Sequence, residues 1–253
     1  MSAREHATGL YMTGIRDGRP REAVAAHTGA RYTQHSTGVA DGQEGFIAFF
    51  EAFLARNPRR DIRVVRALED GRHVFLHVHQ SLNDGEAEWV TADFFDSDAD
   101  GKIVEHWDVI AAHATNPAGR SNIDGAAEIH DLDRTEANKA TVRGLMDALI
   151  SGTADGLEAI LAEDLVTHGG GMADGRAGFR ARLAAGGGAL SLQDCVLMVG
   201  EGNFIATLSR AREGAVDHCR SDLFRLEDGR VVEHWDTTEP VPPAAELANS
   251  GKF

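Results

Sequence analysis

The sequence predicts an α+β protein of two tandem domains, each with helices packed on one face of a curved antiparallel sheet. The block DGKIVEHWD at residues 100–108 returns as DGRVVEHWD at residues 228–236. The chain has 253 residues, so each copy takes roughly 130, an ordinary domain length and far longer than a solenoid unit. In each copy, segments with helical spacing precede strand-like segments separated by turns, an order typical of this fold class.

Shorter blocks extend the match outward from this repeat. YTQH (32–35) and ADG (40–42) correspond to LVTH (165–168) and ADG (173–175), and ADFF (92–95) corresponds to SDLF (221–224). A repeat of this length indicates duplication of a complete domain. We therefore expect a first domain over residues 1–118, a linker over 119–133, and a second domain with a C-terminal tail over 134–253.

The first copy begins with three expected helices, over residues 7–17, 20–28 and 44–56. The third is amphipathic (EGFIAFFEAFLAR) and ends at Asn57-Pro58, because proline cannot continue a helix. Four expected strands follow over 61–68, 72–82, 87–95 and 102–111, and they are rich in Val, Ile, Phe and Trp. The turn sequences EDG, NDG and DG separate them, as in antiparallel hairpins.

The second copy repeats this order, with helices expected over 134–150, 154–161 and 176–185 and four strands between 191 and 237. It differs from the first copy by the glycine runs Gly169–Gly171 and Gly186–Gly188 and by shorter hairpins. These glycine runs match no phosphate-loop pattern. We expect its pocket to differ in shape from the first.

Composition excludes several classes of partner. The formal charge is −15, with 40 acidic and 25 basic residues, which argues against nucleic acid and anionic membranes, since both require a clustered cationic surface. No apolar run is long enough to span a membrane, and the N-terminus lacks the features of a signal peptide. We expect a cytoplasmic protein. Cys195 and Cys219 lack metal-like spacing and are interpreted as reduced thiols.

The motifs of both copies resemble a known family. They are YTQH (32–35), VADG (39–42), DGRHV (70–74) with His77, DFF (93–95), GKIVEHWD (101–108), and a tail with VPP (241–243) and NSGKF (249–253). They resemble the SnoaL-like polyketide cyclases of the nuclear transport factor 2-like superfamily, over nearly the whole chain and twice. The resemblance implies a cone-shaped α+β barrel with one pocket per domain, no organic cofactor, and acid/base chemistry on a carbonyl compound or carbon acid. It leaves the substrate open.

Strand alternation indicates which side chains share a face. His106 and Asp108 lie on one face of their strand, so Glu105 and Trp107 point to the other. Asp93 shares a face with Thr91 and Phe95 on the neighbouring strand. Residues 73, 75, 77 and 79 form another one-sided row, which includes three histidines. An enclosed carboxylate beside an imidazole can have its pKa raised by desolvation, which suits proton abstraction next to a carbonyl.

We therefore predict Asp108 as the general base or acid of the first copy. Its expected partners are His106, His35, His77 and Asp93, and the corresponding set in the second copy is Asp236, His234, His168 and Asp222. The resemblance carries over most firmly to Asp108 and Asp236. Structural interpretations stay open for the EHWD motif and for His35 and His168, which can buttress a turn. Asp41 and Asp174 are interpreted as turn residues, and Trp107 and Trp235 as packing residues.

Two other kinds of site share part of this pattern. His77 and His79 with His106 and Asp108 suggest a metal site in the first copy alone, because the second copy has Leu208 and Arg210 at the approximate histidine positions. The chain has 12 histidines, so one-sided histidine pairs arise easily by chance, and no metal is expected. Arg220 and Asp222 with Asp236 are similar to the Arg/Asp/Asp set of limonene-epoxide-hydrolase-like proteins. That similarity is set aside because the family's Arg-x-Asp lies one strand earlier and the first copy has Thr91 in place of arginine. No nucleophilic triad is indicated.

The expected function is that of a cofactor-independent aldol-type cyclase, isomerase or dehydratase (lyase) acting on a small or polycyclic carbonyl compound. The alternatives are a non-catalytic small-molecule-binding protein with the same fold, and an epoxide hydrolase-like enzyme. The two domains are expected to form an internal pseudo-dimer, as a monomer or within a homodimer. The histidine row is missing from the second copy, so we also expect an active first domain and a degenerate or differently selective second one.

Overall fold

The computed structural model describes residues 1–116, 118–154, 156–168, 172–184 and 190–253, which form two compact units. The first unit comprises residues 1–112 and 241–253, and the second comprises residues 113–240. The segment after the last strand thus packs on the first unit, whereas the expected linker 119–133 packs on the second. These boundaries differ from the expected ones, because no local pattern in a connecting segment tells which domain it will contact. The glycine runs at 169–171 and 186–188 lie outside the described residues.

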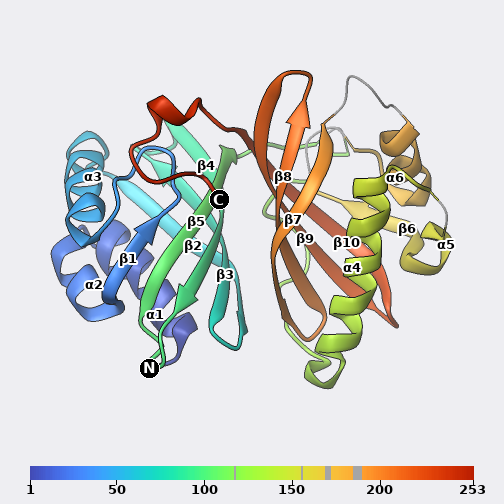
Figure 1. Ribbon diagram of the computed structural model, residues 1–253, viewed down its shortest axis with the longest axis horizontal. Helices are drawn as coiled ribbons and strands as arrows, with labels where there is room; N and C mark the ends of the chain where they lie inside the picture. The colour runs from blue at the N-terminus through green and yellow to red at the C-terminus, as the bar shows by residue number, and fades with distance from the viewer. Residues whose placement is uncertain (117, 155, 169–171, 185–189) are drawn as a thin grey trace. The chain divides into compact units, whose positions relative to one another are not determined.

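The first unit is a five-stranded sheet with helices on one face (Figure 1). Strands β2 to β5 form an antiparallel meander, and β1 pairs in parallel with β5, giving the order β1-β5-β4-β3-β2. The strands are β1 (Thr28–Gln34), β2 (Arg60–Asp70), β3 (His73–Leu82), β4 (Ala87–Ser97) and β5 (Ile103–Ala112). The helical elements are α1 (Ala3–Gly9), the π-helical segment η1 (Leu10–Arg16), α2 (Pro20–His27), α3 (Gln43–Arg56) and, in the tail, the short 3₁₀ turn η3 (Ala244–Glu246).

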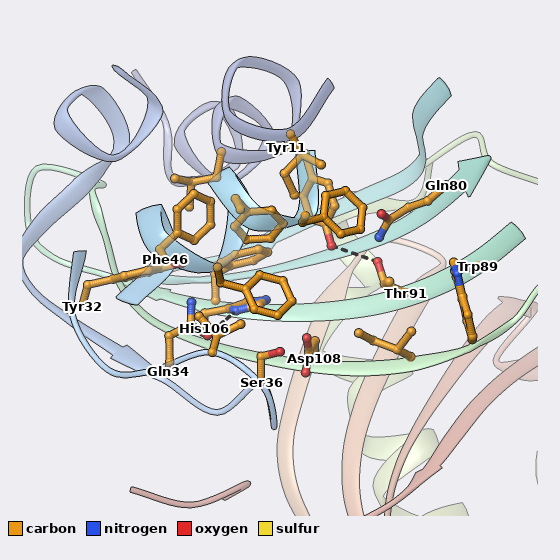
Figure 2. A pocket seen from close by; sticks show the side chains of 18 residues that line it. Tyr11, Tyr32, Gln34, Ser36, Phe46, Gln80, Trp89, Thr91, His106 and Asp108 are labelled. Atoms are coloured by element: carbon orange, nitrogen blue, oxygen red, sulfur yellow. Dashed lines mark hydrogen bonds between the residues drawn. The ribbon is translucent and has the colours of Figure 1, made fainter. Parts of the chain in front are cut away.

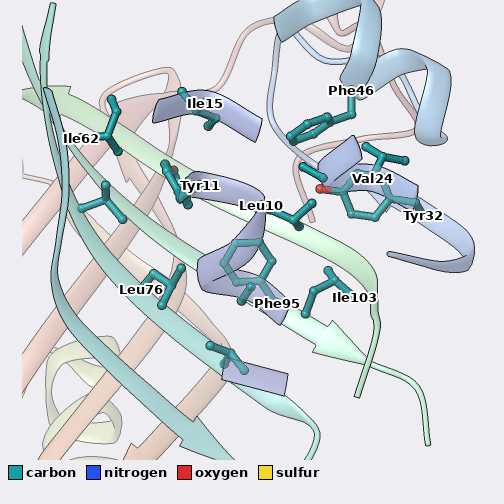
Figure 3. Close-up of a cluster of buried hydrophobic side chains, with 14 of the residues drawn as sticks. Leu10, Tyr11, Ile15, Val24, Tyr32, Phe46, Ile62, Leu76, Phe95 and Ile103 are labelled. Carbon is teal, nitrogen blue, oxygen red and sulfur yellow. The ribbon is translucent and has the colours of Figure 1, made fainter. Parts of the chain in front are cut away.

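The core of the first unit lies between this sheet and its helices (Figure 3). Leu76, Phe95 and Ile103 come from the inner face of the sheet, and Leu10 and Phe46 come from the helical layer. Burial of each such side chain contributes roughly 1.5–3 kcal/mol. The strand period of two and the helical period of 3.6 place these apolar residues on facing surfaces, which is why the layers pack.

The second unit has the same topology, with the strand order β6-β10-β9-β8-β7 and β6 parallel to β10. Its strands are β6 (Leu161–Thr167), β7 (Ser191–Glu201), β8 (Phe204–Glu213), β9 (Val216–Glu227) and β10 (Arg230–Pro240). Its helical elements are η2 (Leu132–Arg134), α4 (Thr135–Ser151), α5 (Leu157–Ile160) and α6 (Gly175–Ala184). Both units are therefore α+β, and the predicted fold class of two tandem domains is confirmed.

Strands β1 and β6 were not predicted. Their sequences, TGARYTQ and LAEDLVT, do not alternate between apolar and polar residues, and each pairs with a strand more than 60 residues further along the chain. The predicted hairpin turns are present: Asp228 (φ 49°) and Gly229 (φ 76°) connect β9 to β10 in the left-handed region, as two-residue hairpins require. Both cysteines are free thiols. Among the described residues, no helix has the length and apolar character required to cross a membrane.

Candidate functional site

The first unit encloses a cavity of about 230 Å³ between its sheet and its helical layer (Figure 2). Aromatic side chains dominate the wall formed by the helices, and α3 alone contributes Phe46, Phe49, Phe50 and Phe53. Trp89 on β4 also lines the cavity and is 41% exposed, so the cavity reaches the surface near this residue. The polar side chains on the wall are Gln34, Ser36, Gln80, Thr91, His106 and Asp108.

Two neighbouring strands supply the polar part of the cavity wall. The register pairs Phe95 with His106 and Asp93 with Asp108, so β4 and β5 direct these side chains to the same face. His106 and Asp108 line the cavity, as strand alternation predicts. Asp93 lies directly behind them and is 1% exposed. Two carboxylates directly opposite each other on adjacent strands repel, so the surrounding groups must compensate for both charges.

Asp93 accepts three hydrogen bonds from buried donors. The hydroxyl of Tyr11 donates to it at 2.7 Å, the hydroxyl of Thr91 at 2.6 Å, and Nε2 of His106 at 3.0 Å. Burial, followed by the charge of Asp93, raises the pKa of Tyr11 well above its usual value, so this hydroxyl keeps its proton. The sequence analysis missed Tyr11, since helical spacing alone does not mark which residue of η1 reaches the sheet.

His106 is held on both sides of its ring. Besides the bond to Asp93, its Nδ1 lies 3.0 Å from Oε1 of Gln34, and the ring stacks on Phe95 with 4.6 Å between ring centres. These contacts fix the position of the imidazole beside Asp108.

Asp108 forms a buried ion pair with a residue of the tail. Nζ of Lys252 lies 2.9 Å from Oδ1 of Asp108, and the side chains are 1% and 7% exposed. Burial by itself would raise the pKa of Asp108, but the charge of Lys252, followed by that of His106 and by hydrogen bonds from Ser36 and Lys252, lowers it below its usual value. The expected raised pKa was wrong because the sequence analysis had no cation in the site. Asp108 is a carboxylate at neutral pH.

The structure does not bring His35 or His77 into the cavity. His35 lies on the outer side with Glu105: its Nε2 is 3.0 Å from Oε1 of Glu105, and its ring stacks on Trp107 at 4.8 Å. His77 pairs across the sheet with Ala92 and accepts a hydrogen bond at Nδ1 from Arg66 at 3.0 Å. The row of residues 73, 75, 77 and 79 thus faces away from the cavity, and the metal site combining His77 with His106 and Asp108 is not assembled.

Asp93, His106 and Asp108 do bring one ligand atom each to within 4.8 Å of one another, which is close enough for a metal ion. However, the oxygens of Asp93 already accept hydrogen bonds from Tyr11, Thr91 and His106. The ammonium of Lys252 already places a positive charge against Asp108. This set of groups suits proton transfer better than metal binding.

The second unit assembles the corresponding residues differently. Arg220 on β9 forms hydrogen bonds to both oxygens of Asp222 and an ion pair to Asp236 at 3.0 Å, and Nε2 of His234 donates to Asp222 at 2.8 Å. Burial opposes ionisation of Asp222, but the charge of Arg220 and the bond from His234 lower its pKa far below the usual value. Arg220 stands where the first unit has Thr91. Arg220 is thus the cation that pairs with both Asp222 and Asp236.

His168 lies outside this cluster, in the same position as His35 in the first unit. Its Nε2 is 2.9 Å from Glu233, its ring stacks on Trp235 at 4.7 Å, and Gly125 packs against all three side chains. The interpretation of His35 and His168 as buttressing residues therefore fits their contacts. Asp41 and Asp174 are turn residues, as expected: each accepts a backbone hydrogen bond, from Gln34 at 2.8 Å and Thr167 at 3.0 Å.

Comparison with known protein families finds a match to the first unit. The sequence profile of the SnoaL-like domain matches residues 11–106, which include most of the cavity wall. No curated protein matches the chain.

Three solved structures are similar to part of the chain. A proposed ketosteroid isomerase from Kribbella flavida DSM 17836 is 22% identical, over 45% of this chain and 89% of that chain, with a TM-score of 0.36. IdmH, a proposed polyketide cyclase from Streptomyces antibioticus, is 23% identical over 40% of this chain and 91% of IdmH, with a TM-score of 0.36. An LEH-like epoxide hydrolase from M. tuberculosis is 20% identical over 42% of this chain and 85% of the hydrolase, with a TM-score of 0.37.

Proposed function

We propose that the first domain acts as a SnoaL-like domain whose cavity carries out cofactor-independent acid/base chemistry on a small carbonyl compound. The match of the SnoaL-like profile to residues 11–106 supports this proposal. The observation that carries this proposal is the buried carboxylate of Asp108 on the wall of a largely aromatic cavity, fixed beside His106. A charged group in such surroundings is seldom retained for stability alone.

Asp108 is assigned the role of general base. It accepts a proton from the carbon next to the carbonyl group, forming a neutral carboxyl and an enolate, and then returns the proton to the same or another carbon. Gln80 also lines the cavity, and its side-chain amide carries donors that a carbonyl oxygen can accept from. Exclusion of water by the phenylalanines strengthens these polar interactions. Isomerisation, aldol-type cyclisation and dehydration all begin with this step.

The size of the cavity favours a compact substrate. Its volume of about 230 Å³ is below the roughly 300–1,000 Å³ typical of pockets for drug-sized ligands. The aromatic wall favours an apolar or planar molecule with its single polar group directed at Asp108. We therefore favour a monocyclic carbonyl compound over a polycyclic one.

Hydrogen exchange on small ketones tests this proposal. The protein is incubated in D₂O with a panel of cyclic ketones and 1,3-diketones, and deuterium at the α-carbon is followed by NMR. General-base catalysis contributes roughly 10²–10⁴-fold, so Asp108→Asn should lose an effect of this size. Asp236→Asn is the matched control in the second domain and should retain the exchange, if the two domains divide their labour. Equal losses from both variants would exclude that division.

The competing function is binding without catalysis. It is favoured by the engagement of both nitrogens of His106 and of one oxygen of Asp108 in contacts within the protein. If ketones bind with equal affinity to the wild type and to Asp108→Asn, and neither protein accelerates exchange, the binding function is correct. Calorimetric titration with the same ketones measures this affinity.

A further inference from the structure

A segment that follows the second domain in sequence packs on the first domain beside its cavity. Residues 248–251 dock on the loop after β1: Nδ2 of Asn249 donates to the carbonyl oxygens of Ser36 at 2.6 Å and Val39 at 2.9 Å. The amide of Ala248 donates to the carbonyl of Thr37 at 3.2 Å. Ser36 and Val39 both line the cavity, so this docking fixes part of the cavity wall.

The same docked segment places one cation next to the proposed base. Lys252 follows directly, and its ammonium is 2.9 Å from Oδ1 of Asp108, with only 1% of the lysine side chain exposed. The titratable groups that face Asp108 come from four elements besides the tail: His106 on its own strand, Asp93 on β4, Tyr11 on η1 and Tyr32 on β1. Asp93 and the two tyrosines cannot supply positive charge. Of these groups and the tail lysine, Lys252 and His106 are therefore the ones whose charge favours the ionised form of Asp108.

The second domain provides an internal comparison. Its connecting segment also docks beside the equivalent strand, where Nδ2 of Asn116 donates to the carbonyl of Thr167 at 2.9 Å. The basic residue of that segment, Arg120, pairs with the partly exposed Asp174 and not with Asp236. Asp236 receives its cation from Arg220 within its own sheet. Among the described residues, the first domain thus obtains this charge from a docked segment and the second does not.

We propose that Lys252 is a positioning residue of the first-domain site, whose ammonium holds Asp108 as an oriented carboxylate and is delivered by the docking of residues 248–252. The role of Asp108 as base rests on the proposed function, whereas the control of its ionisation by Lys252 does not. In this scheme the loss of rate at low pH, for any reaction in the cavity, is set by a residue 144 positions away from the base that it controls.

Carboxyl ¹³C NMR of the full-length protein tests the link directly. The Asp108 resonance, assigned by its absence in Asp108→Asn, is titrated in the wild type, Lys252→Met, Lys252→Arg and Arg120→Met. The wild type and Lys252→Arg should titrate below the ordinary aspartate value of about 3.9. In Lys252→Met, Asp108 should titrate above this value, because the charge that opposes the effect of burial on its pKa has been removed. Arg120→Met is the matched control and should resemble the wild type. An unchanged midpoint in Lys252→Met would overturn the proposal.

Two further readouts separate positioning from folding and from the proposed function. Asn249→Ala weakens docking but keeps the ammonium, and it should also raise the titration midpoint of Asp108; an unchanged midpoint would show that docking does not deliver the charge. In the ketone exchange assay, Lys252→Met should lose activity at pH 5 relative to the wild type and recover at pH 8. The loss at pH 5 should be about tenfold when the midpoint measured by NMR lies one pKa unit above that pH. If the wild type exchanges none of the ketones, the proposed function fails, while the NMR titration still decides the role of Lys252.

Discussion

At Gly125 both the backbone conformation and the neighbouring side chains exclude a Cβ atom, and a pair of variants can measure the two effects separately. It has φ +88°, and a Cβ there would come within 2.3 Å of Oε1 of Glu233 and 2.8 Å of His168 and Trp235. Gly119, in the same segment, has φ +79° but no described atom within 4 Å of such a Cβ. Gly119→Ala should therefore report only the backbone strain of the left-handed region, and Gly125→Ala should report strain plus steric conflict.

The structure sets the expected magnitudes. The left-handed conformation costs a residue with a Cβ roughly 1–2 kcal/mol, which applies to both variants. Glu233 cannot retreat freely, because it accepts hydrogen bonds from His168 at 2.9 Å and from Arg225 at 2.5 Å. Overpacking a fixed site adds roughly 1–3 kcal/mol. Gly125→Ala should thus destabilise the second unit by about 2–5 kcal/mol, and Gly119→Ala by about 1–2 kcal/mol.

Urea unfolding followed by hydrogen exchange of peptides from β10 measures the stability of the second unit separately from the first. A second pair of measurements, on peptides from β5, controls for effects on the first unit and should show no change. Equal destabilisation by the two variants would refute the reasoning, because it would mean that the segment around Gly125 is not held against His168, Glu233 and Trp235.

Three further predictions concern buried polar groups. Tyr11→Phe removes one donor to a buried carboxylate and should destabilise the first unit by about 1–2 kcal/mol in urea unfolding; an unchanged midpoint would contradict the hydrogen bond. Burial lowers the pKa of His6 and of His27, whose Nδ1 atoms are 3.1 Å apart, so below about pH 6.5 the unfolded chain binds more protons and stability falls. His27→Gln should flatten that loss between pH 7 and 5, and parallel curves would exclude this origin. Arg220→Met leaves the buried Asp222 and the partly buried Asp236 without their cation and should destabilise the second unit by about 3–5 kcal/mol, whereas a change below about 1 kcal/mol would show that Arg220 is dispensable.

The helices and the meander strands could be predicted because their signals are local. The apolar residues of α3 recur with helical spacing within a short window of sequence. The turns at Gly71, between β2 and β3, and after Leu82, between β3 and β4, are equally local. Strands β1 and β6 carry no such pattern, since their conformation is set by partners far along the chain. The place of the tail could not be predicted for the same reason.

Strand alternation predicted part of the candidate site. The alternation of side chains correctly placed His106 and Asp108 on one face and Asp93 opposite them. It could not tell which face of β3 meets the helices, so His77 was assigned to the wrong side. Lys252 was part of a motif noted for its resemblance to a family ending, but nothing in the sequence connects it to Asp108.

The ion pair between Asp108 and Lys252 also has a consequence for synthesis. During translation at roughly 5–20 residues per second, the sequence separation of 144 between them corresponds to on the order of 7–30 s of synthesis. A nascent first domain spends that time with two opposed carboxylates and without the cation that later pairs with Asp108. The ion pair, and the docking of the tail on the loop after β1, must wait until the whole second domain has been made.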